Sequence, residues 1–423
     1  MQVRLDYGVR GLPFRIPEAF RGRTEVIRPR FPPPLPDADA ALTRALRSPV
    51  AGPPLAALVP SGASVAISVC DPTRPQPRIP MLRAILEEIG DPGRVTLLVA
   101  TGTHRAPNGR ELEAMFGAEL LATCALVVHD CRDRSELTRL ADTSTGVPVL
   151  LNRRFLEADV RITTGFVEPH FFAGFSGGPK MVAPGLAGLE TILTLHDSAR
   201  VGHPDAVFGI VEGNPIHDDV RRIAARAGVD FGLDVLLDGE KRITGVFGGS
   251  LAEEHAAACA RSRREAMCPV AAPFDVVVTT NSGFPLDQNL YQSVKGLSAA
   301  ARVVRRGGLV LAAAECRDGV PDGSAYHRAV AAETTLADVA ATLAARTACR
   351  PDDWQVQVHC RILEHARVGL RSSLPANTVR SMHLQPVNDL EASCAEALAA
   401  AGPEAALALL PHGPITIPYL SSL

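Results

Sequence analysis

The chain has 423 residues, of which 46% are hydrophobic and 21% charged, and its formal net charge is −3. This composition is typical of a globular protein of two or three domains and excludes a disordered chain. The near-neutral charge, with no run rich in lysine or arginine, argues against nucleic acid as a partner.

The N-terminal segment and the cysteines indicate where the protein acts. The first twenty residues are interrupted by charges and prolines, so they lack the apolar core of a signal peptide, and no later run is long enough for a membrane span. We therefore expect a cytoplasmic protein without a membrane partner. Its nine cysteines contain no C-x-x-C pair, which argues against a zinc site and a disulfide framework. We expect them to be reduced and mostly buried.

Apolar runs alternate with helical patterns along the chain. A proline-rich linker, FPPPLPDADA, leads into a helix that we expect to begin near Asp37. The predicted buried strands are residues 64–69, 95–100, 125–129, 159–164, 231–237, 274–280 and 307–314. The predicted helices include residues 80–90, 108–117, 188–196, 251–267 and 335–346. The alternation predicts an α/β protein with mostly parallel sheets flanked by helices.

Residues 266–273, AMCPVAAP, form the best candidate for a domain boundary. We expect an N-terminal α/β domain of residues 1–268 and a C-terminal α/β domain of residues 269–400. The last segment, residues 401–423, is expected to return to the N-terminal domain.

Unusual residues follow four predicted strands directly. The motifs are CDPTRP, TGTHR, GFVEPHFFAGFSGGPK and NSGFPLDQNLYQSVKG. In open parallel sheets, ligands bind outside the carboxyl ends of the strands. The motifs therefore predict one composite active site in a cleft between the two domains.

His104 and His170 each follow a strand. Neutral imidazole can take up and return a proton near pH 7, so two such histidines suit a general acid/base pair, although an isolated histidine is more often structural. Arg74 lies between two prolines, where it could capture a carboxylate or phosphate or form an ordinary ion pair.

Only three of the 43 basic residues are lysines, namely Lys180, Lys241 and Lys295. A lysine can supply a nucleophilic amine, which arginine cannot. Lys241 lies in a predicted exposed turn, whereas Lys295 would share a helix face with Gln292 and lie near Tyr291, where these residues could hold an anion.

The GFSGGPK run offers backbone N–H groups for an anion-binding nest, but its spacing is not that of a P-loop. No strand is followed by G-x-G-x-x-G, which disfavours a dissociable dinucleotide. His196 ends a predicted helix, which by itself favours a C-cap role.

Six features together resemble the nickel-dependent lactate racemase family, in order and across almost the whole chain. They are DPTRP, TGTHR, EPHFFAGFSGGPK, the histidine sixteen residues later, PLDQNLYQSVKG and PDDWQ. Members of that family are two-domain α/β proteins that carry a nickel-pincer nucleotide. This cofactor is a pyridinium-3-thioamide-5-thiocarboxylic acid mononucleotide with bound nickel, tethered by a thioamide to a lysine.

The resemblance implies a role for each matching position. The implied acid/base pair, one member for each enantiomer, is His104 and His170. The implied covalent attachment residue is Lys180, and the implied nickel ligand is His196. For His196, this implied role replaces the C-cap interpretation. The implied cofactor contacts are Asp71, Thr73, Phe172, Pro184, Gly177 and Gly178. The implied substrate contacts are Arg74, Tyr291, Gln292, Lys295 and Trp354. One departure is Pro179, because the residue before the attached lysine is commonly basic in the family.

The implied activity is that of an isomerase, a racemase or epimerase that inverts C2 of a 2-hydroxy acid by reversible hydride transfer to the tethered nucleotide. The implied partners are this small acid and the cofactor-synthesis proteins. The substrate could instead be larger than lactate, such as malate, an aromatic hydroxy acid or a sugar acid such as an aldonate. A noncatalytic protein that binds a hydroxy acid or nucleotide would not need the histidine pair and the lysine. A zinc hydrolase is disfavoured because no histidine pair with helical ligand spacing encloses a glutamate.

Overall fold

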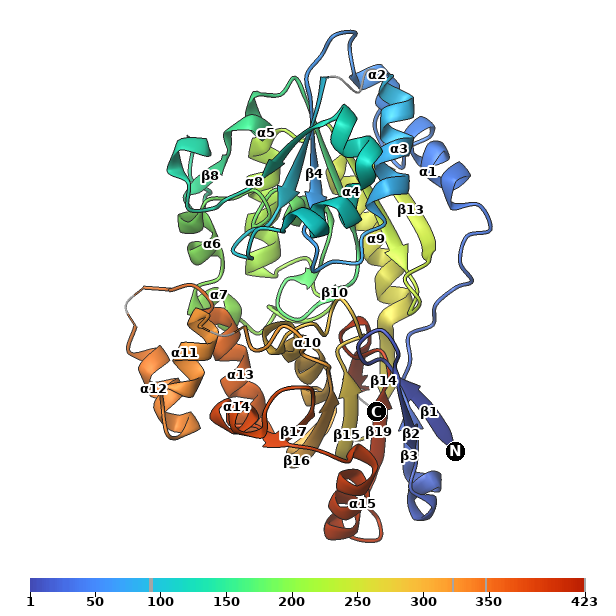
Figure 1. The fold of residues 1–423 in the computed structure, drawn as a ribbon, viewed down its shortest axis with the longest axis vertical. Helices are drawn as coiled ribbons and strands as arrows, with labels where there is room; N and C mark the ends of the chain where they lie inside the picture. The colour runs from blue at the N-terminus through green and yellow to red at the C-terminus, as the bar shows by residue number, and fades with distance from the viewer. Residues whose placement is uncertain (91–93, 322, 347, 422–423) are drawn as a thin grey trace. The chain divides into compact units, whose positions relative to one another are not determined.

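The computed structural model describes residues 1–90, 94–321, 323–346 and 348–421. The chain divides into two compact units (Figure 1). Unit 1 comprises residues 1–30, 169–171 and 265–423, and unit 2 comprises residues 31–168 and 172–264. None of the described helices combines the length and the apolar character that a membrane span requires.

Unit 2 is built on a six-stranded sheet with the strand order β13-β12-β9-β4-β5-β6. These strands are β4 (Val65–Cys70), β5 (Val95–Ala100), β6 (Ala125–Val128), β9 (Val160–Phe166), β12 (Phe231–Leu237) and β13 (Ile243–Gly249). All neighbours pair in parallel except β12 and β13, which form an antiparallel edge. Most residues of these strands are apolar, as expected for a sheet that is covered by helices.

The remaining elements of unit 2 surround this sheet. Its helices are α1 (Ala38–Arg47), α2 (Leu55–Leu58), α3 (Arg78–Ile89), α4 (Gly109–Thr123), α5 (Arg153–Glu157), α6 (Leu189–Leu195), α7 (Ser198–Gly202), α8 (Pro215–Ala227) and α9 (Leu251–Ala266), with short turns η3 (Arg134–Glu136) and η4 (Gly178–Met181). Three short strands are β7 (Leu137–Leu140), β8 (Val149–Asn152) and β11 (Gly174–Phe175). The side chain of Asp37 caps α1, as the linker pattern predicted.

Unit 1 contains a second six-stranded sheet, entirely parallel, with the order β18-β17-β16-β15-β19-β3. Its strands are β3 (Thr24–Val26), β15 (Phe274–Thr280), β16 (Val304–Ala313), β17 (Arg367–Arg371), β18 (Gln385–Pro386) and β19 (Leu407–Leu410). The other strands of the unit are β1 (Gln2–Leu5), β2 (Leu12–Arg15), β10 (Pro169–His170), β14 (Met267–Val270) and β20 (Ile417–Leu420).

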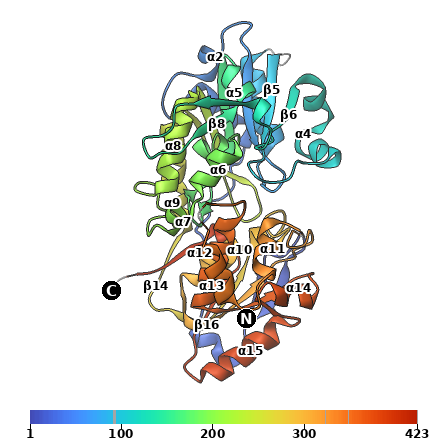
Figure 2. The same cartoon turned by 90° about the vertical axis from the view of Figure 1, so that its left-hand side faces the viewer.

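The helices of unit 1 cover its parallel sheet. They are α10 (Leu290–Ala301), α11 (Ala325–Ala331), α12 (Leu336–Ala344), α13 (Asp353–His365), α14 (Ala376–Ser381) and α15 (Leu390–Ala401), with turns η1 (Glu18–Arg23) and η5 (Gly413–Ile415). Helix α10 packs on β15 and β16 and lies beside α13 (Figure 2). The α15 side chains and the β1–β2 hairpin share one apolar core with these strands.

The predicted fold class is confirmed, because two mainly parallel sheets are flanked by helices. Each predicted strand has a counterpart that overlaps it closely, and eight of the nine cysteines are buried. The division into units differs from the predicted domains. Residues 1–30 belong to unit 1 because β3 pairs with β19, and residues 401–421 belong there too because β19 also pairs with β15. Residues 422–423 of the predicted last segment lie outside the described residues.

Candidate active site

Two buried side chains shape the loop that follows β4. The Arg78 guanidinium donates to the carbonyls of Cys70 (2.9 Å) and Arg74 (3.0 Å), and also to the Asp71 carbonyl. Gln76 accepts from the Cys70 N–H at 2.8 Å. These bonds define the main chain of the DPTRP motif, and they fix the positions from which Asp71 and Arg74 extend.

Asp71 and His104 join the loops at the carboxyl ends of β4 and β5. Asp71 Oδ2 lies 2.8 Å from His104 Nδ1. Burial raises the pKa of the Asp71 carboxyl, but the contacts with His104 and Arg74 outweigh it and place the pKa well below its ordinary value. An ionised carboxylate only accepts hydrogen bonds, so His104 Nδ1 carries the hydrogen and Nε2 carries the lone pair. This is the tautomer of a histidine base that takes a proton at Nε2.

Thr73 completes this loop. Its N–H and its hydroxyl both donate to Asp71 Oδ1, and its hydroxyl accepts from Arg74 at 2.8 Å. Asp71 and Thr73 were expected to contact the cofactor, and that role stays a prediction. The structure gives them hydrogen bonds within the loop that orient His104 and Arg74.

Lys180 lies in η4, with its side chain mostly buried. Its Nζ is 5.9 Å from the centre of the Phe172 ring. Burial, with the charge of Arg74 as a second cause, lowers the pKa of the Lys180 amine to about 7. A large fraction of this amine is therefore neutral at physiological pH, which is the form that acts as a nucleophile.

His196 lies at the C-cap of α6, beside Phe172. The two rings are 5.3 Å apart in an edge-to-face arrangement. His196 Nδ1 lies 2.8 Å from the Ile192 carbonyl, which can only accept, so Nδ1 carries the hydrogen and Nε2 the lone pair. Burial and the charge of Lys180 lower the His196 pKa to about 4, so the ring is neutral. The C-cap interpretation and a metal-ligand role are therefore compatible, since a backbone carbonyl commonly orients a ligating histidine.

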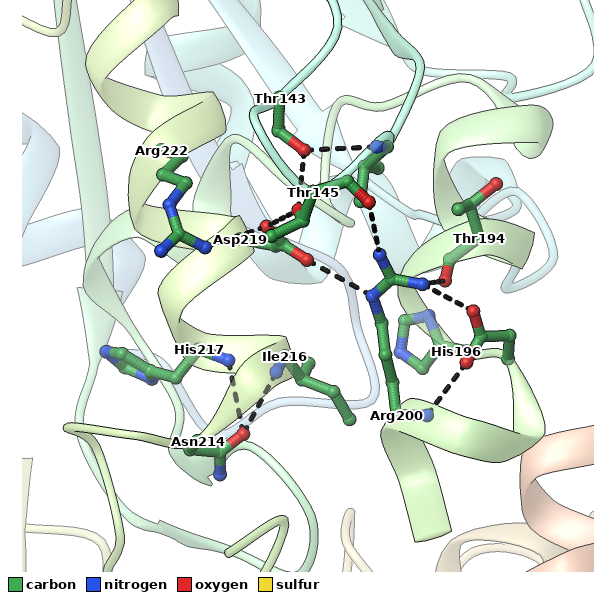
Figure 3. Close-up of polar contacts among 12 residues, drawn as sticks. Thr143, Thr145, Thr194, His196, Arg200, Asn214, Ile216, His217, Asp219 and Arg222 are labelled. Atoms are coloured by element: carbon green, nitrogen blue, oxygen red, sulfur yellow. Dashed lines mark hydrogen bonds and ion pairs between the residues drawn. The ribbon is translucent and has the colours of Figure 1, made fainter. Parts of the chain in front are cut away.

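An ion-pair network holds the chain on both sides of His196 (Figure 3). Arg200 on α7 donates to the Thr194 carbonyl at 3.3 Å and pairs with Asp197, the residue that caps α7. Its Nε lies 3.1 Å from the carboxylate of Asp219, a buried residue of α8. The network ties the end of α6 to α7 and α8, so it restricts the position of the His196 backbone.

A backbone contact beside Pro184 joins the Lys180 segment to the loop that carries His104. The Gly102 N–H donates to the Gly185 carbonyl at 3.0 Å, next to Pro184. The predicted contact of Pro184 with a pyridinium ring stays a prediction.

The glycines before Lys180 serve internal contacts. The nest interpretation is wrong for Gly178, because its N–H donates to Asp234 Oδ2 at 2.7 Å. Gly177 and Gly178 have φ values of 74° and 48°. A Cβ on Gly178 would lie 2.4 Å from the His255 ring. These positions need glycine because the surrounding protein leaves no room, and the predicted cofactor contact of both residues stays a prediction.

Unit 1 carries the other predicted residues on two packed helices. Tyr291, Gln292 and Lys295 lie on α10, and Gln292 and Lys295 are buried. Trp354 on α13 donates from its indole Nε1 to the Tyr291 hydroxyl at 2.8 Å. The expected helix is thus present, and the substrate contacts of these four residues stay a prediction. His170 lies on β10 of this unit, with its ring centre 4.9 Å from that of Phe171.

The structure therefore brings the predicted residues together in two groups. Unit 2 holds Asp71, Thr73, Arg74, His104, Phe172, Gly177, Gly178, Lys180, Pro184 and His196, and unit 1 holds His170, Tyr291, Gln292, Lys295 and Trp354. Sequence reasoning missed Arg78, Asp219 and Asp234. Asp234 had a signal, because it is the single charged residue of the apolar strand FGLDVLL.

Comparisons with known proteins agree along most of the chain. Residues 7–209 match the family described as lactate racemase N-terminal domain, and residues 270–417 match the lactate racemase C-terminal domain. A lactate racemase of Thermoanaerobacterium thermosaccharolyticum is 34% identical over 395 residues, 92% of each chain. A lactate racemase of Lactiplantibacillus plantarum is 33% identical over 382 residues, 88% of each chain.

Solved structures show the same architecture. The structure of the lactate racemase apoprotein from Thermoanaerobacterium thermosaccharolyticum has a TM-score of 0.91 at 32% identity, covering 99% of this chain and 100% of the other. A protein from Thermotoga maritima shares the fold, with a TM-score of 0.68 at 17% identity, covering 92% of this chain and 100% of the other.

Proposed function

The chain belongs to the lactate racemase family, and on that premise we propose that it interconverts the C2 stereoisomers of a 2-hydroxy acid. The observation that carries the proposal is the arrangement of Lys180, Phe172 and His196. A mostly buried amine of lowered pKa lies over an aromatic ring, and that ring contacts a neutral imidazole. A purely structural segment would not need this combination.

Members of this family use a nickel-pincer nucleotide, and the residues of unit 2 fit that group. The neutral Lys180 amine suits a thioamide link, His196 offers an imidazole nitrogen to nickel, and Phe172 provides an apolar surface for a planar ring. Because the cofactor would bring carbon and sulfur donors, one protein ligand is sufficient. When bound, the nucleotide supplies a reversible acceptor for the hydrogen at substrate C2.

His104 would handle the hydroxyl proton. Asp71 holds its Nδ1–H, which leaves Nε2 to take the proton of the substrate hydroxyl and stabilises the imidazolium that results. In the proposed reaction His170 has the same task for the opposite enantiomer, so that the proton can be returned on either face. Both histidines are needed for racemisation in each direction.

Charged and polar side chains would hold the substrate. Arg74 is bound to Thr73 and fixed by Arg78, which suits bidentate capture of a carboxylate. On α10, Gln292 and Lys295 supply an amide and an ammonium group. A firmly held carboxylate is what stereochemical inversion at the adjacent carbon requires.

The substrate side chain remains open to several 2-hydroxy acids. Lactate is the substrate named for the two relatives, and malate, an aromatic hydroxy acid and an aldonate are the larger alternatives. A noncatalytic hydroxy-acid-binding or nucleotide-binding protein is the second candidate function. The Asp71–His104 pair favours the enzyme, because binding alone does not need an oriented base.

A racemisation assay tests the proposal. The protein is co-expressed with cofactor-synthesis proteins, and each enantiopure 2-hydroxy acid is followed by circular dichroism. The expected result is racemisation of at least one acid by the wild type and by Lys241→Ala, and none by Lys180→Ala. Lys241 is a matched control because it lies in a turn after Asp238 and has no proposed role. Wild-type turnover by Lys180→Ala would refute the proposal.

A further inference from the structure

Four buried side chains hold the main chain of residues 172–178, the segment that leads into the Lys180 turn. They extend from the start of α8, from β12 and from α9, and we call them the cradle; Figure 3 shows the two at the start of α8. The bonds run from Asn214 Nδ2 to the Phe172 carbonyl (2.9 Å), from His217 Nδ1 to the Ala173 carbonyl (3.0 Å), from His255 Nε2 to the Ser176 carbonyl (2.9 Å) and from the Gly178 N–H to Asp234 Oδ2 (2.7 Å).

Asp234 makes the cradle contact nearest to Lys180. Gly178 opens the η4 turn, and amides at the start of a helical turn have no partner within it. The preceding residue, Gly177, has no side chain that could cap the turn. Asp234 supplies that cap from β12, and the Lys180 N–H then closes the turn onto the Gly177 carbonyl at 3.1 Å.

Two glycines make room for the Asp234 carboxyl. A Cβ on Gly165 would lie 2.6 Å from Asp234 Oδ1, and a Cβ on Gly177 would lie 2.8 Å from Oδ2. Asp234 itself is 1% exposed in a strand that is otherwise apolar. Burial of a carboxyl opposes folding, so a branched apolar residue would suit β12 better if stability were the only requirement.

Glu254 on α9 is a second buried carboxyl close by and provides a control. It packs against Gly232, and among the described residues its two carboxyl oxygens have no hydrogen-bond partner. It therefore shares the burial of Asp234 but not the contact with the η4 turn. Burial raises the pKa of both carboxyls, that of Asp234 to about 7, so an amide replacement alters little charge at slightly acid pH.

We propose that Asp234 is a positioning residue for Lys180. Through the Gly178 amide it sets the orientation of the η4 turn, and so the direction in which the lysine side chain extends toward Phe172. This inference rests on the proposed function, in which Lys180 is the attachment residue. It adds a residue of β12, 54 positions away in the sequence from Lys180, to the machinery of cofactor attachment.

The test compares four proteins, namely wild type, Asp234→Ala, Asp234→Asn and Glu254→Gln. Amide hydrogen exchange is measured on each purified protein, and the fraction of Lys180 peptide carrying an adduct is measured after co-expression with cofactor-synthesis proteins. In Asp234→Ala we expect exchange in the η4 turn to rise about tenfold, which corresponds to one lost hydrogen bond, and the adduct fraction to fall. Exchange in β4 and α3 should not change. Asp234→Asn keeps an acceptor, so it should restore both readouts, and Glu254→Gln should match the wild type.

Equal adduct fractions in Asp234→Ala and wild type would overturn the inference while leaving the proposed function intact. A wild type that carries no adduct would instead count against the proposed function. If Asp234→Ala does not fold, hydrogen exchange in the wild type still tests the inference. The inference requires the Gly178 amide to exchange as slowly as the β12 amides. Rapid exchange of that amide in the folded wild type would overturn it.

Discussion

At the scale of single residues, the chemistry of this protein depends on groups whose protonation state is set by their neighbours. Asp71 is kept ionised by His104 and Arg74 despite its burial, and it fixes the tautomer of His104. Burial lowers the pKa of Lys180 to about 7 and keeps His196 neutral. On an ordinary surface the Lys180 amine would be charged at neutral pH, and His104 would have no buried carboxylate to fix its tautomer.

Replacing Asp71 with asparagine tests the orientation of His104. The amide can donate to Nδ1, so it favours the tautomer with the hydrogen on Nε2, where a base cannot accept a proton. We expect kcat for racemisation to fall by about 10²–10⁴. Asp205→Asn is the matched control, since it removes an exposed aspartate 3.8 Å from His203 in the same unit. Equal kcat values for wild type and Asp71→Asn would contradict the assigned role.

At the scale of elements, the segment from β11 to α6 is shaped by close contacts within unit 2. Gly174 on β11 has φ 77°, and a Cβ there would lie 2.0 Å from the Ile210 carbonyl. Together with Gly177 and Gly178 it lets the chain turn tightly inside a packed unit. The sequence assigned Gly177 and Gly178 to a cofactor contact, which stays a prediction, but glycine spacing alone did not reveal these close neighbours within the protein.

Comparing Gly174→Ala with Gly146→Ala separates two costs of adding a side chain, namely a clash with neighbouring atoms and strain in the backbone. Gly146 also has a positive φ, 81°, but nothing within 4 Å would meet its Cβ. Gly146→Ala should lower the free energy of unfolding by about 1 kcal/mol, the cost of a left-handed alanine. Gly174→Ala should cost about 2 kcal/mol more, because the neighbouring backbone must move. Denaturant unfolding measures both, and equal losses would show that the contact does not matter.

At the scale of the whole molecule, residues 1–30 complete the second sheet instead of the first. Strand β3 pairs with β19, and the β1–β2 hairpin adds Leu5 and Phe14 to the core of unit 1. The sheet order of unit 1 therefore depends on both ends of the chain. Such pairing has a high entropic cost of loop closure, which only the completed core offsets.

The variant Phe14→Ala tests whether residues 1–30 stabilise the sheet of unit 1. The side chain is fully buried, so its removal should cost about 3–5 kcal/mol. We expect the amides of β15 and β16 to exchange faster with solvent, while those of β4 and β5 keep their protection. Val9→Ala, at a position that is 66% exposed, is the control and should change neither set. Faster exchange in β4 and β5 alone would place residues 1–30 with the first sheet.

Much of the architecture could be predicted because parallel strands buried on both faces are continuous apolar runs. Runs such as VAISVC and VVVTT can be predicted as strands from their composition alone, without knowing which strands lie beside them. The pairing of β3 with β19 could not be predicted, since periodicity carries no information on distant partners. The motifs located His104 and Lys180, but the Asp71–His104 bond and the Asp234 contact depend on which loops meet at the sheet edge.

Attachment of the cofactor to Lys180 can be measured as the mass of the protein after co-expression with cofactor-synthesis proteins, with peptide mapping and nickel analysis. Only three lysines can carry the adduct, so its location is unambiguous. We expect an adduct on the Lys180 peptide, about one nickel per adduct, and neither in Lys180→Ala. An unmodified, nickel-free wild type, under conditions that load a known lactate racemase, would contradict it.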